Sequence, residues 1–179
     1  MGTTYSVVYA IAYVGAREGH QYERDLKKVI EDYMEEHYGS CCGSAYQIDY
    51  HVKSQTTITD NSNGRKLRPD IVIWAKVEGE WKAVVLELKS YENTYLPSKC
   101  VDQTCRYRTN LTEFDDENCE CVGAIICCRE TTKMSEAFKK HAFVKDVKIR
   151  TFEPDPKNKS YEENIYHIMS TAMDMMRKN

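Results

Sequence analysis

The sequence predicts a mixed α/β protein in which helices flank a central β-sheet. Apolar residues recur at helical spacing in several segments, runs rich in β-branched residues lie between them, and turn formers separate the two kinds of segment. Hydrophobic residues make up 41% of the chain and charged residues 30%, which is typical of a globular protein. The length of 179 residues fits a single domain, residues 1–179.

The first predicted helix spans residues 19–38, because Leu26, Ile30 and Met34 fall on one face and Gly39 stops the pattern. The other elements follow from the same two periodicities and from turn residues. We expect strands at 46–52 and 56–59, a turn at 60–64, a hairpin of strands at 70–76 and 81–89, a helix at 101–114, a strand at 121–128, a helix at 133–142, a strand at 144–152 and a helix at 161–177.

Charge and apolar patterning exclude some classes of protein. A net charge of -3 argues against a protein that coats nucleic acid non-specifically. No apolar run approaches the roughly 20 residues of a membrane span, and residues 6–16 are too short and lack the basic start of a signal peptide. Eight cysteines, including the adjacent pairs Cys41-Cys42 and Cys127-Cys128, then favour reduced thiols. We therefore expect an intracellular, cytoplasmic protein without a membrane partner.

The predicted hairpin carries charged residues to one end of two apolar strands. Asp70 opens the first strand, and Glu87 and Lys89 close the second. A turn centred near Gly79 places residue 70 roughly opposite residue 88, so Asp70 lies beside Glu87 and Lys89, which share one face. Charges at the ends of apolar strands cost free energy unless they are paired or bind a metal. A salt-bridge cluster and a metal-dependent active centre both meet that requirement.

The full string around these residues resembles a known nuclease superfamily. Pro69-Asp70 looks like the PD element, and Glu87-Leu88-Lys89 like the second element, of the PD-(D/E)XK nucleases. The resemblance covers about residues 19–107 and implies a restriction-endonuclease-like fold and a Mg²⁺- or Mn²⁺-dependent nuclease. It implies that Asp70 and Glu87 bind the metal, that the Leu88 carbonyl is a further ligand, and that Lys89 assists the attacking water.

The first helix supplies candidates for another metal ligand. Residues 19–26 (GHQYERDL) are similar to the opening helix of archaeal Holliday-junction resolvases, in which a glutamate completes the site. That resemblance points to Glu23, which shares the inward stripe with Leu26, and Glu18 is the second choice. Other superfamily members use a first-helix histidine, so His20 is the reserve ligand. An ordinary surface glutamate and histidine are the structural alternative.

Residues expected to bind substrate follow the hairpin or precede Asp70. Gln103 and Tyr107 share a helix face and resemble the Q-x-x-x-Y element of RecB-like exonucleases, which supports the active site and nucleic-acid contacts. Basic residues nearby are candidates for phosphate contacts. They are Arg65, Lys66 and Arg68 before Asp70, and Arg106 and Arg108 beside Tyr107, of which Arg68 and Arg106 are the preferred pair.

Several alternatives stay open at this stage. DNA is favoured over RNA as the substrate, against an RNA endonuclease of the cap-snatching type that uses His20. A non-cleaving domain of the same fold could bind nucleic acid or protein instead. Cys100-x4-Cys105 with Cys119-x-Cys121 is a competing Zn²⁺ or iron–sulfur site, although the spacing matches no tight knuckle. The sequence is compatible with a monomer and with a homodimer.

Overall fold

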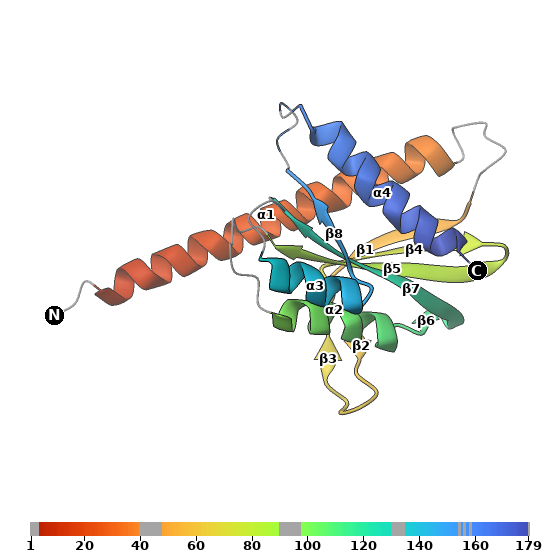
Figure 1. Ribbon diagram of the computed structural model, residues 1–179, viewed down its shortest axis with the longest axis horizontal. Helices are drawn as coiled ribbons and strands as arrows, with labels where there is room; N and C mark the ends of the chain where they lie inside the picture. The colour runs from red at the N-terminus through yellow and green to blue at the C-terminus, as the bar shows by residue number, and fades with distance from the viewer. Residues whose placement is uncertain are drawn as a thin grey trace.

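A mixed sheet forms the middle layer of the protein (Figure 1). The computed structural model describes residues 4–39, 48–89, 98–129, 135–153, 155, 157 and 159–178, without the side chains of residues 4–20 and 98. The strand order is β1-β4-β5-β7-β6, with β8 also paired to β7. β5 is central, since it runs antiparallel to β4 and parallel to β7. The strands are β1 (Tyr50–Ser54), β4 (Ile71–Val77), β5 (Glu80–Lys89), β6 (Glu113–Phe114), β7 (Glu117–Cys128) and β8 (Lys148–Thr151).

Helices cover both faces of the sheet, so the predicted mixed α/β architecture is confirmed (Figure 1). α1 (Thr4–Tyr38) and α4 (Tyr161–Arg177) pack against one face. α2 (Ser98–Asn110) and α3 (Glu136–Val144) pack against the other. The result is a three-layer arrangement in which each face of the sheet has its own apolar core.

The first helix is longer than predicted, because it begins at Thr4 and not at residue 19. Residues 4–18 contain no proline, so nothing removes a donor from the helical hydrogen-bond ladder there. α1 has 35 residues. Even so, no helix in the described ranges combines the length and the apolar character that a membrane crossing requires.

Strand pairing moves several other boundaries. β1 starts at Tyr50 and extends to Ser54, because Ser54 pairs with Ile71 of β4; the predicted start at 46–47 lies outside the described residues. The predicted helix 101–114 was wrong at its end: α2 stops at Asn110, and the next residues form β6 beside β7. β7 starts four residues before the predicted 121, and β8 is shorter than the predicted 144–152. The C-terminal helix has its predicted bounds.

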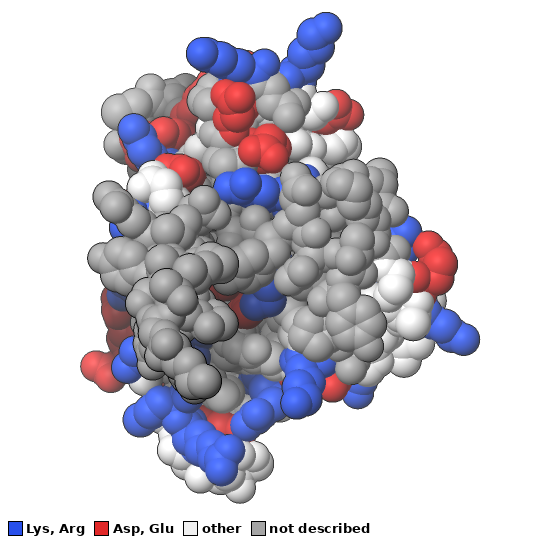
Figure 2. All heavy atoms as spheres, turned by 90° about the vertical axis from the view of Figure 1, so that its left-hand side faces the viewer, with Lys and Arg blue, Asp and Glu red and all other residues white. Residues whose placement is uncertain are grey.

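The prediction that residues 56–59 continue the sheet was also wrong. β2 (Ile58–Thr59) pairs with β3 (Lys66–Leu67) in a separate two-stranded hairpin, which projects at the bottom of Figure 1. Gln55 has a φ of 53°, a conformation that ends β1 and turns the chain away. Figure 2 shows Lys and Arg side chains gathered at the bottom of the molecule, the end at which this hairpin projects in Figure 1.

The turn between β4 and β5 sets the register of the central hairpin. Val77 pairs with Glu80, so only Glu78 and Gly79 form the turn, and their φ values of 54° and 86° match a type I′ turn. Glu80, which lies just before the predicted strand 81–89, is the first residue of β5. Ile71 consequently pairs with Leu86, and one step further Asp70 lies opposite residue 87, not the predicted 88.

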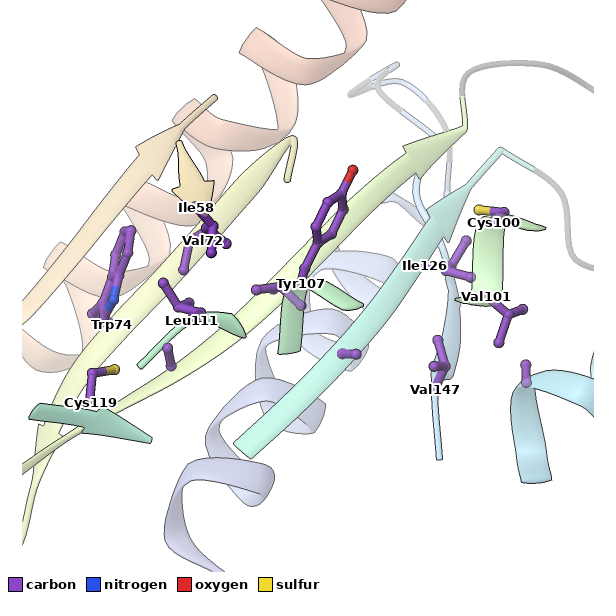
Figure 3. Packing of buried hydrophobic residues seen from close by; sticks show 14 of the residues in the cluster. Ile58, Val72, Trp74, Cys100, Val101, Tyr107, Leu111, Cys119, Ile126 and Val147 are labelled. Atoms are coloured by element: carbon purple, nitrogen blue, oxygen red, sulfur yellow. The ribbon is translucent and has the colours of Figure 1, made fainter. Parts of the chain in front are cut away.

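Side chains along β5 alternate between the two cores. Leu86 and Leu88 point toward α1 and α4, whereas Val85 points toward α2 and α3. Figure 3 shows the core on the α2 side, in which Trp74, Tyr107 and Ile126 pack between the helices and the sheet. Glu87 and Lys89 follow Val85 at intervals of two, so they extend this face to the end of the strand.

Candidate active site

Asp70 and Glu87 form a cross-strand pair at the open end of the hairpin. The Leu88 N–H donates a hydrogen bond to Asp70 Oδ2 at 2.7 Å, so the backbone groups of Leu88 point toward β4 and those of Glu87 toward β7. Positions 70 and 87 are therefore of the non-hydrogen-bonded kind, in which opposite side chains lie closest. The two carboxyl groups consequently lie next to each other at the end of these two strands.

Pro69 removes a backbone hydrogen bond that the Leu88 carbonyl would otherwise accept. In the ladder, residue 69 would face residue 88 and would donate its N–H to the Leu88 carbonyl. Pro69 is buried and has no N–H, so it cannot make that bond. The Leu88 carbonyl points to the same side as its N–H, which is the side of Asp70. A proline at this position thus keeps a backbone oxygen next to the two acids.

Glu87 is a buried carboxyl group, 4% exposed. Its Oε1 accepts a hydrogen bond from Lys89 Nζ at 2.5 Å, while its Oε2 is buried and has no hydrogen-bond partner among the described residues. Burial and the nearby charge of Asp70 raise the pKa of Glu87 to about 7, against the opposing influence of Lys89 and of the Tyr107 hydroxyl. One lysine therefore does not compensate two adjacent carboxylates.

Lys89 remains a cation in this environment. Burial acts to lower the pKa of its ammonium group, but Glu87 and Asp70 outweigh burial, so the net direction is upward. A protonated lysine cannot accept a proton from water at neutral pH. Its chemistry is restricted to orienting a polar group and stabilising negative charge.

Tyr107 and Gln103 connect α2 to the buried glutamate. Gln103 Nε2 donates to the Tyr107 hydroxyl, and that hydroxyl points toward the carboxyl-terminal end of β5 (Figure 3). The pKa of Tyr107 is raised, first by burial and then by the charge of Glu87. With 1% of its surface exposed, Tyr107 has little surface for substrate, whereas a substrate contact was predicted for it.

Glu23 is brought to the same end of the sheet, by a contact that the sequence did not predict. It is 9% exposed, and its Oε2 accepts a hydrogen bond from Gln55 Nε2 at 3.0 Å. The Gln55 N–H in turn donates to the Asp70 carbonyl at 3.1 Å. One residue thus links Glu23 to Asp70. The side chains of Glu18 and His20 lie outside the described ones, so their predicted roles are not placed.

Two of the predicted phosphate-binding arginines differ in their surroundings. Arg106 forms an ion pair with Asp60, which is 2% exposed, so Arg106 ties α2 to the β2–β3 hairpin. Arg68 is exposed, just before Pro69. Asp60 was not predicted as part of any site: its place in a run of turn formers was visible in the sequence, but its burial was not. Arg108 contacts the carbonyl groups of residues 145 and 146.

The competing cysteine site is not assembled. Cys100 and Cys119 lie at opposite ends of the core on the α2 side (Figure 3). Cys105 Sγ contacts the Lys145 carbonyl, and Cys121 Sγ that of Gly123. Within the described ranges, no three His, Cys, Asp or Glu side chains are already arranged around a common metal position, and this holds for Glu23, Asp70 and Glu87 as well as for the cysteines.

Comparisons with known proteins give no functional assignment, so any assignment depends on the site's own geometry. No protein-family model matches the chain, and no curated protein is significantly similar to it. The geometry at the end of β4 and β5 is therefore the basis for a functional argument.

Proposed function

We propose that the protein is a metal-dependent nuclease of the PD-(D/E)XK kind that hydrolyses phosphodiester bonds. The observation that carries the proposal is Glu87: a buried carboxyl group opposite Asp70, with one oxygen on Lys89 and the other without a partner in the described structure. A surface salt bridge needs no such burial, and an unpaired buried carboxylate oxygen is costly.

The donor groups at this position fit a hard divalent cation. Glu87 Oε2, the Asp70 carboxylate and the Leu88 carbonyl are oxygen donors, the ligand type that Mg²⁺ and Mn²⁺ prefer. Glu23 is a candidate for a further ligand or for a position beyond a bound water. When bound there, the cation polarises the scissile phosphate and lowers the pKa of the attacking water.

The chain's own residues then divide the work. Lys89, a cation held by Glu87, orients the attacking water and stabilises the charge that develops on the phosphate. Tyr107, which Gln103 holds in place, orients the Glu87 carboxyl group so that its second oxygen is available to the metal. We assign Gln103 and Tyr107 as positioning residues on these grounds.

The β2–β3 hairpin supports nucleic acid as the substrate. Arg65, Lys66 and Arg68 are exposed on or beside it and precede Asp70 by only two to five positions. Arginine and lysine side chains are common contacts of phosphate oxygens, so these three are candidates to bind phosphates near the cleaved bond. We propose DNA as the substrate and an intracellular setting, in which the six described cysteines are thiols.

A cleavage assay tests the proposal. The purified protein is incubated with linear duplex DNA, circular single-stranded DNA and RNA, with Mg²⁺, with Mn²⁺ or with EDTA. We expect cleavage with either metal and none with EDTA. Cleavage of equal rate in EDTA would contradict the mechanism, and no cleavage of any substrate would favour a non-cleaving domain.

An RNA endonuclease that uses His20 is the second candidate. The same assay, repeated with variants, separates this enzyme from the DNA nuclease. Glu23→Gln should abolish most activity on DNA if Glu23 completes the metal site. Loss of RNA cleavage in His20→Ala, with Glu23→Gln still active, would favour the histidine-dependent enzyme.

A further inference from the structure

A groove of about 490 Å³ lies between α1 and α4, on the opposite side of the sheet from Glu87. Figure 1 shows the two helices crossing there. Aromatic rings and carboxylates line the groove, and no lysine or arginine is among the lining residues that the structure describes. Tyr33, Tyr161 and Tyr166 supply the phenol rings, and Asp32, Glu36 and Glu162 supply the acids.

Acidic side chains act on the two inner tyrosines of this groove. Burial raises the pKa of Tyr161, and the charges of Asp25 and Asp32 raise it further. Burial likewise raises the pKa of Tyr33, and Glu36 adds to this while Arg177 opposes it. Tyr166 is 58% exposed, so a large aromatic surface faces solvent at the groove. An open aromatic surface with acids beside it attracts organic cations, because the ring faces and the carboxylates both carry negative potential.

The same pair of helices already holds one guanidinium in this way. Arg177 of α4 lies over the ring of Tyr38 of α1, 5.9 Å from the ring centroid, and donates a hydrogen bond to the Tyr38 hydroxyl at 3.3 Å. That intramolecular contact occurs five residues along α1 from Tyr33. The groove offers the same tyrosine faces, here with acids beside them, and the described residues that line it include no lysine or arginine.

We propose that the groove between α1 and α4 binds the arginine or lysine side chains of a basic protein segment. Charge complementarity selects the cation, and the open run of rings along two helices suits a peptide side chain that lies across them. The guanidinium of arginine suits the site best, because it stacks on aromatic faces and binds carboxylates in a forked geometry. This proposal does not depend on nuclease activity, since the groove and Glu87 lie on different faces of the sheet.

Fluorescence anisotropy with a labelled Gly-Arg repeat peptide tests the proposal, with a Gly-Glu repeat peptide as the reference. The test variant combines Asp32→Asn with Glu162→Gln. The control combines Glu78→Gln with Glu120→Gln, which removes the same charge from exposed positions elsewhere. We expect the test variant to bind the basic peptide at least tenfold more weakly and the control to bind within about twofold of the wild type, because local pairs outweigh net charge.

A second variant, Tyr166→Leu, removes an exposed ring without changing charge and should weaken binding several-fold. Equal losses in the test and control variants, or equal affinity for the basic and acidic peptides, would overturn the proposal. Spermidine that binds the wild type as tightly as the peptide, and loses affinity in the test variant, would assign the groove to free polyamines and overturn the protein segment as its occupant.

Discussion

Two lysine–carboxylate pairs lie at opposite ends of the β4–β5 hairpin. At the open end, Lys89 and Glu87 are 2.5 Å apart, and their side chains are 25% and 5% exposed. Near the turn, Lys76 and Glu117 are 3.5 Å apart, and their side chains are 32% and 59% exposed. The residue types are the same, but the first pair is more buried and has another carboxylate, Asp70, beside it.

The difference between the pairs comes from what covers them. α2 places the Tyr107 ring beside Glu87, so that carboxyl group is removed from water, and Asp70 beside it adds a second negative charge. Lys76 and Glu117 face solvent, where an ion pair contributes roughly 0–1 kcal/mol. Burial next to an excess of negative charge, not the presence of a lysine–carboxylate pair, therefore distinguishes a candidate catalytic centre from a surface salt bridge.

The largest expected effect comes from breaking the buried pair. Glu87→Gln and Lys89→Ala should each reduce cleavage at least about 10²-fold, the scale of losing one preorganised electrostatic group at a reacting phosphate. Lys76→Ala and Glu117→Gln should leave the rate within about twofold. Cleavage rates are measured at saturating metal, with the melting temperature as a fold control. If the buried-pair variants only melt earlier and cleave normally, the pair is structural.

A smaller effect is expected from the residue that holds Glu87. Tyr107→Phe should slow cleavage roughly tenfold, because it removes the hydroxyl beside Glu87 that lowers the pKa of that carboxyl group. Tyr22→Phe is the matched control, since the buried Tyr22 hydroxyl donates to the Phe152 carbonyl at 2.8 Å on the other face. The control should lower stability and spare the rate. Equal rate losses in the two variants would contradict a positioning role for Tyr107.

The smallest effect concerns a pair of intermediate exposure, Asp60 with Arg106, whose side chains are 2% and 47% exposed. Hydrogen bonds from the Ser62 side chain, from Arg106 and from the Ser62 backbone lower the pKa of Asp60 below its ordinary value of 3.8. The native state thus binds a proton less readily than the unfolded state. Asp60 therefore stabilises the fold above pH 3.8, and this contribution is lost as the pH falls through the native pKa.

Thermal melts from neutral to acid pH test this sign. The melting temperature of the wild type should fall more steeply below pH 3.8 than that of Asp60→Asn, which has no charge to lose. Asp115→Asn serves as the control, because Asp115 is 65% exposed in its pair with Lys53. Parallel melting curves for wild type and Asp60→Asn would show that the pair with Arg106 does not stabilise the hairpin.

The sequence by itself determined the local features of this protein. Alternation along residues 81–89 predicted that Glu87 and Lys89 share a face, and the structure confirms it on the α2 side. The C-terminal helix and the mixed α/β class also followed from periodicity. These features depend on contacts between near neighbours in the chain, which the spacing of apolar residues encodes directly.

Only the tertiary structure decided how the segments meet. The two-residue turn shifted the register so that Asp70 lies opposite Glu87, and strand pairing turned the end of a predicted helix into β6. The contacts of Glu23 with Gln55 and of Asp60 with Arg106 join residues 32 and 46 positions apart. Such pairings depend on where whole elements pack, because burial and long-range contacts outweigh local preference when a chain has one core on each face of a sheet.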